Sequence, residues 1–246
     1  MIVDIIVLFF SVFLTGLILL SKPFKGIANL KSFLIFGGSY LFSLTIIHLL
    51  PEVFHHAEED VTLGYFVLLG FFLQLALEHF SQGIEHGHVH IRKDSSGILS
   101  RPIFLLISLS IHAFLEGTLL AHPNIVVHEH SSKALLVGIV LHKIPAAIAL
   151  CSVLLSVMES RVKLITYIFI FAAASPLGLL LSDYLIDINF LSSRLFLILF
   201  AIVSGNFLHI STTIFYETSP DHHLSVKKLL ISILGAAIAL LAEFLL

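Results

Sequence analysis

Long apolar runs separated by short polar connections fill the chain from one end to the other. Eight of these runs reach about twenty residues, the length that an α-helix needs to cross the hydrocarbon core of a bilayer. They cover roughly residues 2–20, 31–50, 62–80, 103–122, 133–157, 163–183, 194–215 and 227–245. The pattern predicts an all-α polytopic membrane protein with eight transmembrane helices.

The first apolar run has the length of a secretory signal peptide but not its charge pattern. A signal peptide begins with basic residues, whereas this run carries Asp4 and is followed by Lys22 and Lys25. We therefore expect residues 2–20 to remain as a membrane span.

The overall composition agrees with a membrane protein and excludes several other classes. Hydrophobic residues make up 58% of the chain, charged residues 12%, and the mean hydropathy is +1.06, whereas globular proteins average about 45–50% apolar and about 25% charged residues. We expect a single transmembrane domain over residues 1–246, in contact with the lipid bilayer. The net charge of −3 offers no basic face to nucleic acid. The single cysteine, Cys151, cannot form an internal disulfide.

Basic residues are concentrated in alternate connections between the runs. The connections after the first, third, fifth and seventh runs carry Lys22, Lys25, Lys31, Arg92, Lys93, Arg101, Arg161, Lys163, Lys227 and Lys228. Apart from Lys143 within the fifth run, the other basic residues are Lys133 and Arg194. The positive-inside rule makes these four connections cytoplasmic. Both termini are then expected outside, as an even number of spans requires, in a plasma or inner cell membrane.

Histidine is unusually frequent, with 15 residues against 13 lysines and arginines together. Because histidine is the commonest metal ligand and titrates near neutral pH, this excess favours transition-metal handling or proton coupling over a chance bias. The alternating His86, His88 and His90 lie in the expected cytoplasmic loop, at about residues 81–102. They are typical of a short, weak metal-binding tract.

Two apolar runs carry ionisable residues at their centres: His112 and Glu116 in the fourth, His142 and Lys143 in the fifth. A charged side chain at this depth costs at least about 2.5–3.5 kcal/mol, so each needs a partner. Residues four apart share one face of a helix, and the fifth run offers His142 to that face. Two imidazoles and a carboxylate suit Zn²⁺, and would also accept Fe²⁺, Mn²⁺, Co²⁺ or Cd²⁺. Lys143 should repel a metal ion unless it balances Glu116.

Other polar residues lie nearer the ends of the runs: His48 and Glu52 in the second, Glu78 in the third, Asn206 and His209 in the seventh. We assign His48, Glu52, Asn206 and His209 to the entrance or pathway of the ion. Glu78 is expected to reach the membrane interface. For any single histidine, the alternative is a buried side chain bonded to a backbone carbonyl.

Pro145 interrupts the fifth run beside this constellation. A proline inside a helix frees the carbonyl four residues earlier, here that of Leu141, next to His142. Broken helices of this kind commonly mark substrate sites in transporters. An ordinary packing kink is the alternative.

Three motifs resemble those of the ZIP (Zrt-, Irt-like protein) family of metal-ion transporters. They are His112-Ala-Phe-Leu-Glu-Gly117, His142-Lys-Ile-Pro-Ala146 and His48-Leu-Leu-Pro-Glu52. The resemblance implies uptake of divalent metal, foremost zinc, toward the cytoplasm. It implies a 3+2+3 arrangement, in which two inverted three-helix repeats enclose the fourth and fifth spans and these spans carry the metal in an elevator-like motion. It also assigns the metal ligands to His112, Glu116 and His142.

The chain departs from the full family pattern at three positions: Ala113, Lys143 and Ala146. Richer family members carry polar or acidic groups there, which belong to a two-metal centre. We hypothesise that the ammonium of Lys143 substitutes for the second ion and leaves one metal site. The missing carboxylate at Ala146 leaves the affinity and the transport competence of the site open.

Other functions remain as alternatives at this point. A membrane-embedded zinc hydrolase would use the same residues, but it needs a bound water and a general base, and the chain has no His-Glu-x-x-His sequence. A haem-binding membrane protein could use histidines from different spans as axial ligands: His48, His112, His142 and His209. A passive metal channel is a third alternative. The transported ion, the driving force and the oligomeric state are left open, with a homodimer as one alternative.

Overall fold

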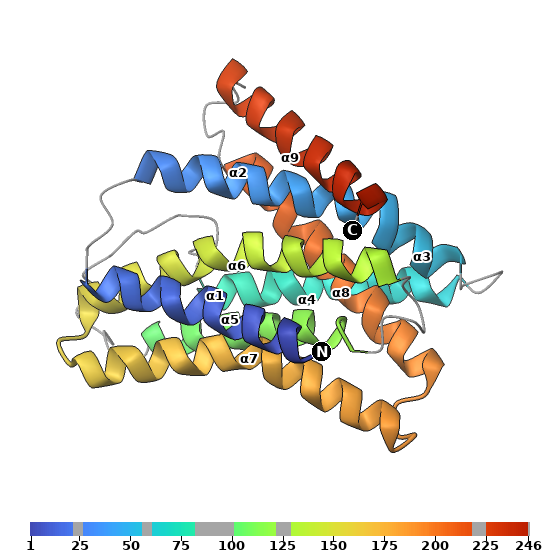
Figure 1. Ribbon diagram of the computed structural model, residues 1–246, viewed down its shortest axis with the longest axis horizontal. Coiled ribbons are helices and arrows are strands. Elements are labelled where there is room, and N and C mark those ends of the chain that lie inside the picture. Colours follow the sequence, from blue (N-terminus) through green and yellow to red (C-terminus); the bar gives the residue numbers. More distant parts are fainter. Residues whose placement is uncertain (22–26, 56–60, 82–100, 122–128, 218–224, 246) are drawn as a thin grey trace.

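The computed structural model is a bundle of long helices that run roughly side by side (Figure 1). The structure describes residues 1–21, 27–55, 61–81, 101–121, 129–217 and 225–245. Their helices are α1 (Ile2–Ser21), α2 (Ile27–Leu44), the π-helical segment η1 (Thr45–Leu49), α3 (Leu50–His55), α4 (Thr62–Ser81), α5 (Arg101–Thr118), α6 (Glu129–Val157), α7 (Arg161–Asp187), α8 (Ser193–Glu217) and α9 (Val226–Leu245).

These helices correspond in order to the eight predicted runs, because α2, η1 and α3 together form the second run. Seven of the eight are long and apolar enough to cross a membrane within the described residues. The prediction of an all-α, multi-pass membrane protein is therefore confirmed. The eighth, α5, contains a shorter apolar helix over Pro102–Thr118.

The fourth run ends earlier than the predicted range of 103–122. The 18 residues of α5 span about 27 Å at 1.5 Å per residue. Beyond Thr118, the backbone N–H groups of Leu119, Leu120 and Ala121 bond to carbonyls three residues earlier. The tighter turn after α5 therefore contains three further buried residues.

The second run continues past Pro51, which a regular α-helix would not tolerate without losing a hydrogen bond. The hydrogen-bond pattern changes just before this proline: in η1, the Leu50 N–H bonds to the carbonyl of Thr45, five residues earlier. The resulting π-turn carries His48 and leads directly into α3. Such π-turns occur frequently at functional sites.

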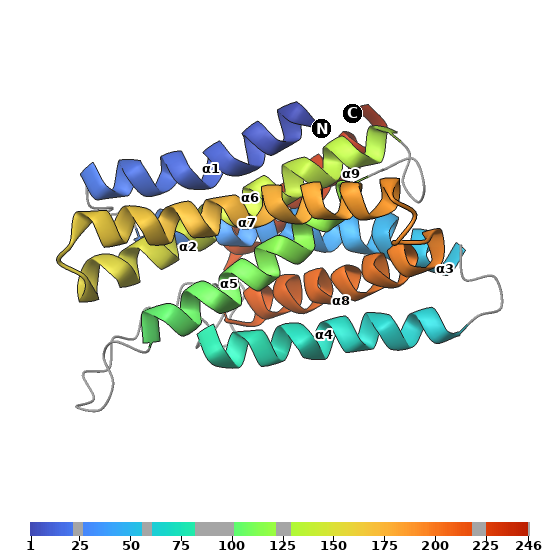
Figure 2. The ribbon, with the colours of Figure 1, turned by 90° about the horizontal axis from the view of Figure 1, so that it is seen from below.

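The helices pack as two groups of four. In the first group, α5 and α1 both pack against α7, and α1 also packs against α6. In the second, α4 packs against α8, and α2 packs against α9 and α8. The groups meet where α2 and α9 contact α6 and where α4 contacts α5. Figure 2 shows α4 and α8 side by side along one edge and α1 on the opposite edge.

Glycines bring helix backbones into direct contact inside each group. A Cβ added at Gly117 or Gly178 would overlap a backbone carbonyl across the α5–α7 interface, and the same holds for Gly70 and Gly205 between α4 and α8. Small residues allow this close approach in membrane helices. Each of these pairs therefore packs as a tightly fitted unit.

Burial along the bundle is uneven in a way that matches a membrane environment. Among the long apolar helices, α6 is the most buried, while α1 and α9 are the least. The outer faces of these peripheral helices expose large apolar side chains, including Phe10, Leu241 and Phe244. The central helix α6 is also the one that carries His142 and Lys143.

Candidate metal centre

The fourth span, α5, presents His112 and Glu116 on one face, one helical turn apart. The Nε2 atom of His112 lies 2.9 Å from Oε1 of Glu116, and the side chains are 3% and 0% exposed, respectively. A helix in which residues four apart stack on the same face produces this contact. The pairing that the spacing predicted is therefore present in the structure.

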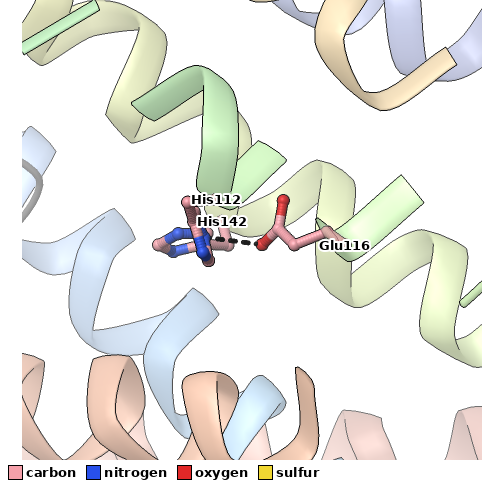
Figure 3. Close-up of side chains that lie close together, drawn as sticks. All are labelled: His112, Glu116 and His142. Atoms are coloured by element: carbon pink, nitrogen blue, oxygen red, sulfur yellow. Dashed lines mark ion pairs between the residues drawn. The ribbon is translucent and has the colours of Figure 1, made fainter. Parts of the chain in front are cut away.

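The fifth span, α6, brings His142 to the same face. Each of the three residues offers a ligand atom, and these atoms all lie within 4.8 Å of one another. The imidazole rings of His112 and His142 are 5.6 Å apart between centroids and almost perpendicular, at 86°. Figure 3 shows both rings next to the Glu116 carboxylate. Ligands of tetrahedral zinc lie about 3.3 Å apart, given bonds of about 2.0–2.1 Å, so small side-chain rotations would close the group around one ion.

Lys143 lies on the other side of the same carboxylate. Its Nζ atom is 3.1 Å from Oε2 of Glu116, and the lysine side chain is 2% exposed. Each oxygen of Glu116 thus has a separate nitrogen neighbour, one from His112 and one from Lys143. A carboxylate buried this deeply needs a compensating charge, and Lys143 provides it, as the sequence suggested.

A buried serine on α7 supports α5 at this level. Ser175 Oγ donates a 2.6 Å hydrogen bond to the carbonyl of Ala113, and Lys143 Nζ approaches the same carbonyl at 3.5 Å. Sequence reasoning missed Ser175. The only signal was its place before Pro176 in an apolar run, which does not indicate a partner on α5.

Pro145 lies inside α6, which continues through it. The Leu141 carbonyl, which the proline leaves without an intrahelical partner, faces α2 at Gly37. A Cβ added at Gly37 would lie 3.2 Å from that oxygen. The segment of α6 before Pro145 therefore packs closely on α2, directly beside His142.

The predicted entrance residues lie in η1 and in α3. His48 is buried, and its Nδ1 atom is 3.1 Å from Oε1 of Glu243 on α9. Glu52 is half-buried on α3. Sequence reasoning did not single out Glu243, because it lies far from His48 along the chain and near the end of an apolar run.

The predicted residues of the seventh span take part in contacts between α8 and α4. His209 Nε2 lies 3.4 Å from Oε2 of Glu78, and its ring packs edge-on against Phe71 at 4.8 Å. The amide nitrogen of Asn206 donates to the backbone carbonyls of Gly70 and Ile202. Glu78, expected only to reach the interface, thus has an intramembrane partner.

The histidine tract of the predicted loop, His86, His88 and His90, lies outside the described residues. Within the described residues, His112, Glu116 and His142 form the group of three or more His, Cys, Asp or Glu side chains with ligand atoms close enough to hold a metal ion.

Comparison with known proteins covers the part of the chain that holds this group of residues. The family model described as ZIP Zinc transporter matches residues 85–243, which include all three residues of the group. Protein zntD of Dictyostelium discoideum is 30% identical over 165 residues, covering 63% of this chain and 24% of that protein. Zinc transporter ZIP9 of Micropogonias undulatus is 29% identical over 168 residues, covering 64% of this chain and 51% of that protein. The chain thus spans between a quarter and a half of the length of these curated relatives. By the extent of the family match, the chain belongs to the ZIP zinc transporter family.

Proposed function

We propose that this protein transports divalent metal ions, foremost zinc, across a membrane toward the cytoplasm. The observation that carries the proposal is the group of three buried ligand atoms within 4.8 Å on two central helices, at His112, Glu116 and His142. Two imidazoles and one carboxylate are ligands that Zn²⁺ accepts. The relative from Micropogonias undulatus is named a zinc transporter, and the matched family is one of transporters rather than enzymes.

The composition of the site suits an ion that must leave again. Three protein ligands leave a position for water, unlike the closed four-ligand shell of a structural zinc site. Glu116 supplies one negative charge, and Lys143 already balances it at 3.1 Å. The metal therefore enters a site with little net negative charge, which limits its affinity and favours release. Fe²⁺, Mn²⁺ and Cd²⁺ are further candidate cargoes, since ligand type alone does not separate them from zinc.

We assign Lys143 the role of a substitute for a second ion. Its ammonium lies against Glu116 Oε2, on the opposite side of the carboxylate from His112. A second cation would have to displace it. This arrangement supports a centre that holds one metal ion per chain.

The charge pattern and the helix packing support the proposed pathway. The first residue of α1 and the last of α9 lie toward the same end of the bundle (Figure 1), in accord with two termini on the outer side. His48 and Glu52 belong to that end and serve the entrance. Asn206 and His209 lie nearer the other end of the bundle and serve the pathway to the cytoplasm.

The packing pairs support the 3+2+3 arrangement of inverted repeats. If α1, α2 and α4 correspond to α7, α8 and α9, and α5 to α6, each contact should have a counterpart. Three contacts meet this condition, because α4–α8 maps onto α9–α2, α5–α7 onto α6–α1, and α4–α5 onto α9–α6; the α2–α6 contact has no comparable α8–α5 counterpart among the described residues. An elevator-like motion would carry α1, α5, α6 and α7 past the other group.

The decisive experiment is zinc uptake into proteoliposomes that contain a zinc-sensitive dye. We expect His112→Ala and Glu116→Gln to abolish saturable uptake and to lower zinc binding in detergent by one ion per chain. His79→Ala, an exposed histidine on α4, is the matched control and should behave as the unmodified protein. Full uptake by both site variants would contradict the proposal.

The remaining alternatives are separated by simple measurements. A passive channel would show no saturation with metal concentration and no stimulation of uptake by metal on the far side. A haem protein would be coloured when purified. The mass of the purified protein in detergent decides between a monomer and the homodimer that the sequence left open.

A further inference from the structure

Two buried hydroxyl groups connect the two groups of four helices. On α2, Tyr40 Oη donates a 2.9 Å hydrogen bond to the carbonyl of Ala134 on α6. On α5, Ser108 Oγ donates a 2.6 Å hydrogen bond to the carbonyl of Leu77 on α4. Each bond therefore joins a helix of the first group (α1, α5, α6 and α7) to a helix of the second group (α2, α4, α8 and α9).

The two bonds lie on opposite sides of the central metal group. Helices α5 and α6 run in opposite directions along the bundle (Figure 2). Ser108 precedes His112 by four residues on α5, and Ala134 precedes His142 by eight residues on α6. At 1.5 Å per residue, the bonds are displaced from the metal ligands by about 6 Å toward one end of the bundle and about 12 Å toward the other. The first group is thus bonded to the second group both above and below its metal ligands.

The ring of Tyr40 is fitted into a gap in the surface of α6. The side chain is fully buried, and a Cβ added at Gly138, one turn after Ala134, would lie 3.0 Å from its Cε1 atom. The ring therefore takes up space that a side chain at Gly138 would need. Behind it, α9 approaches closely, since a Cβ added at Gly235 would lie 3.3 Å from the backbone nitrogen of Tyr40. Tyr40 is thereby fixed opposite one particular turn of α6.

A displacement of α6 along α2 would undo this fit. A shift by one turn toward Tyr40 would bring Leu141 and His142 opposite the ring in place of Gly138. The same shift would move the Ala134 carbonyl by about 5.4 Å, beyond hydrogen-bond distance of the tyrosine hydroxyl. A buried hydroxyl that loses its partner raises the free energy of the protein. The two bonds therefore stabilise the arrangement described here over a shifted one.

The contacts within each group are of a different kind. At Gly117 and Gly178 in the first group, and at Gly70 and Gly205 in the second, backbones touch and leave no space for a Cβ atom. Between the groups, a Cβ added at Gly37 would keep 3.2 Å from the Leu141 carbonyl. A single hydrogen bond contributes only a modest net free energy, so the bonds between the groups can open while the contacts within each group persist.

We propose that Tyr40 and Ser108 are positioning residues for transport. They latch the first group, which carries the metal ligands, onto the second group in the arrangement of this structure, and both bonds open when the first group moves. The inference rests on the proposed function and adds the two residues that set the balance between a latched and a shifted arrangement.

The test measures this balance as a distribution of distances between two spin labels. The labels are attached to Val162→Cys on α7 and Val226→Cys on α9, both exposed positions, in a Cys151→Ala background and in metal-free protein in lipid nanodiscs. Removing one hydrogen bond between membrane helices shifts an equilibrium by about threefold. We expect Tyr40→Phe and Ser108→Ala each to raise the ratio of the shifted to the latched distance by about threefold. The double variant should raise it by about ninefold, because distant sites act additively.

A matched control separates a latch from a merely structural hydrogen bond. Ser204 is fully buried, and its hydroxyl bonds to the carbonyl of Phe200 within α8. Ser204→Ala should therefore leave the distance ratio unchanged, even where it lowers the melting temperature. Every one of these variants should still bind one zinc ion per chain in detergent.

An unchanged ratio in either Tyr40→Phe or Ser108→Ala, or an equal shift in Ser204→Ala, overturns the inference. Saturable zinc uptake by His112→Ala would instead overturn the proposed function. Because the distances are measured without metal and the uptake with it, the two failures are distinct.

Discussion

Replacing Lys143 with methionine keeps most of the side-chain volume but removes the ammonium that lies 3.1 Å from Glu116 Oε2. At an effective dielectric constant of 20, two unit charges at this distance attract by about 5 kcal/mol. Breaking one partner of a buried ion pair typically destabilises a protein by about 3–5 kcal/mol, because the other charge stays buried. We therefore expect a clearly lower melting temperature for the metal-free variant.

Metal should reverse this effect. A zinc ion bound to Glu116 at about 2 Å would lie about 5 Å from the Lys143 ammonium, and the two would repel by about 7 kcal/mol at the same dielectric constant. Removing the lysine abolishes this repulsion, which is larger than the lost attraction. The variant should accordingly bind zinc more tightly than the unmodified protein, and its turnover should fall because release slows.

The assay is thermal unfolding in detergent over a series of zinc concentrations, together with equilibrium zinc binding. Ligand that binds only the folded state raises stability with the logarithm of its concentration above Kd. The zinc-dependent rise in melting temperature should therefore begin at a lower concentration in Lys143→Met. Lys133→Met, at an exposed position on the same helix, controls for loss of a charge. Weaker zinc binding by Lys143→Met would refute the electrostatic reasoning. A second bound ion per chain would instead agree with the substitute role of Lys143.

Three further predictions concern the packing around the site. Gly178→Ala should lower the melting temperature sharply, because the new Cβ would overlap the backbone of Phe114. Gly64→Ala is the control and should change it little, since the atom nearest to its new Cβ lies at 3.8 Å. Equal effects of the two variants would argue against backbone contact between α5 and α7. Ser175→Ala removes a 2.6 Å hydrogen bond to α5 and should lower the stability by about 1 kcal/mol, which thermal unfolding would measure. We also expect the variant to bind zinc more weakly. Cys151 is 1% exposed, so a thiol reagent should label it only as the protein unfolds, and rapid labelling of the folded protein would contradict its burial.

The sequence predicted the spans because the membrane imposes a length and a polarity on each of them. It did not predict how the second run passes Pro51, since the π-turn η1 depends on a local change in hydrogen bonding that a hydrophobicity pattern does not contain. The end of α5 was also placed too late. The residues after Thr118 are as apolar as the helix itself, and only the backbone bonds distinguish the turn.

From the sequence, the candidate site was predictable where its residues lie one turn apart on the same helix. His112 and Glu116 are four apart, and their contact follows from helix geometry. The partners of His48 and His209 were not predictable in this way, because Glu243 and Glu78 belong to other helices. Which helices become neighbours is decided by packing over long distances along the chain, and the same holds for Ser175.

The glycines between α5 and α7 determine where the protein can deform. With Gly117 and Gly178 in backbone contact and Ser175 bonded to α5, α5 cannot shift along α7 without a steric clash. Whatever displaces His112 and Glu116 on α5 must displace α7 with them as one rigid piece. Under the transport function proposed above, sliding would be confined to surfaces such as that between α4 and α5, and a small molecule bound there would block the motion without contacting the metal site.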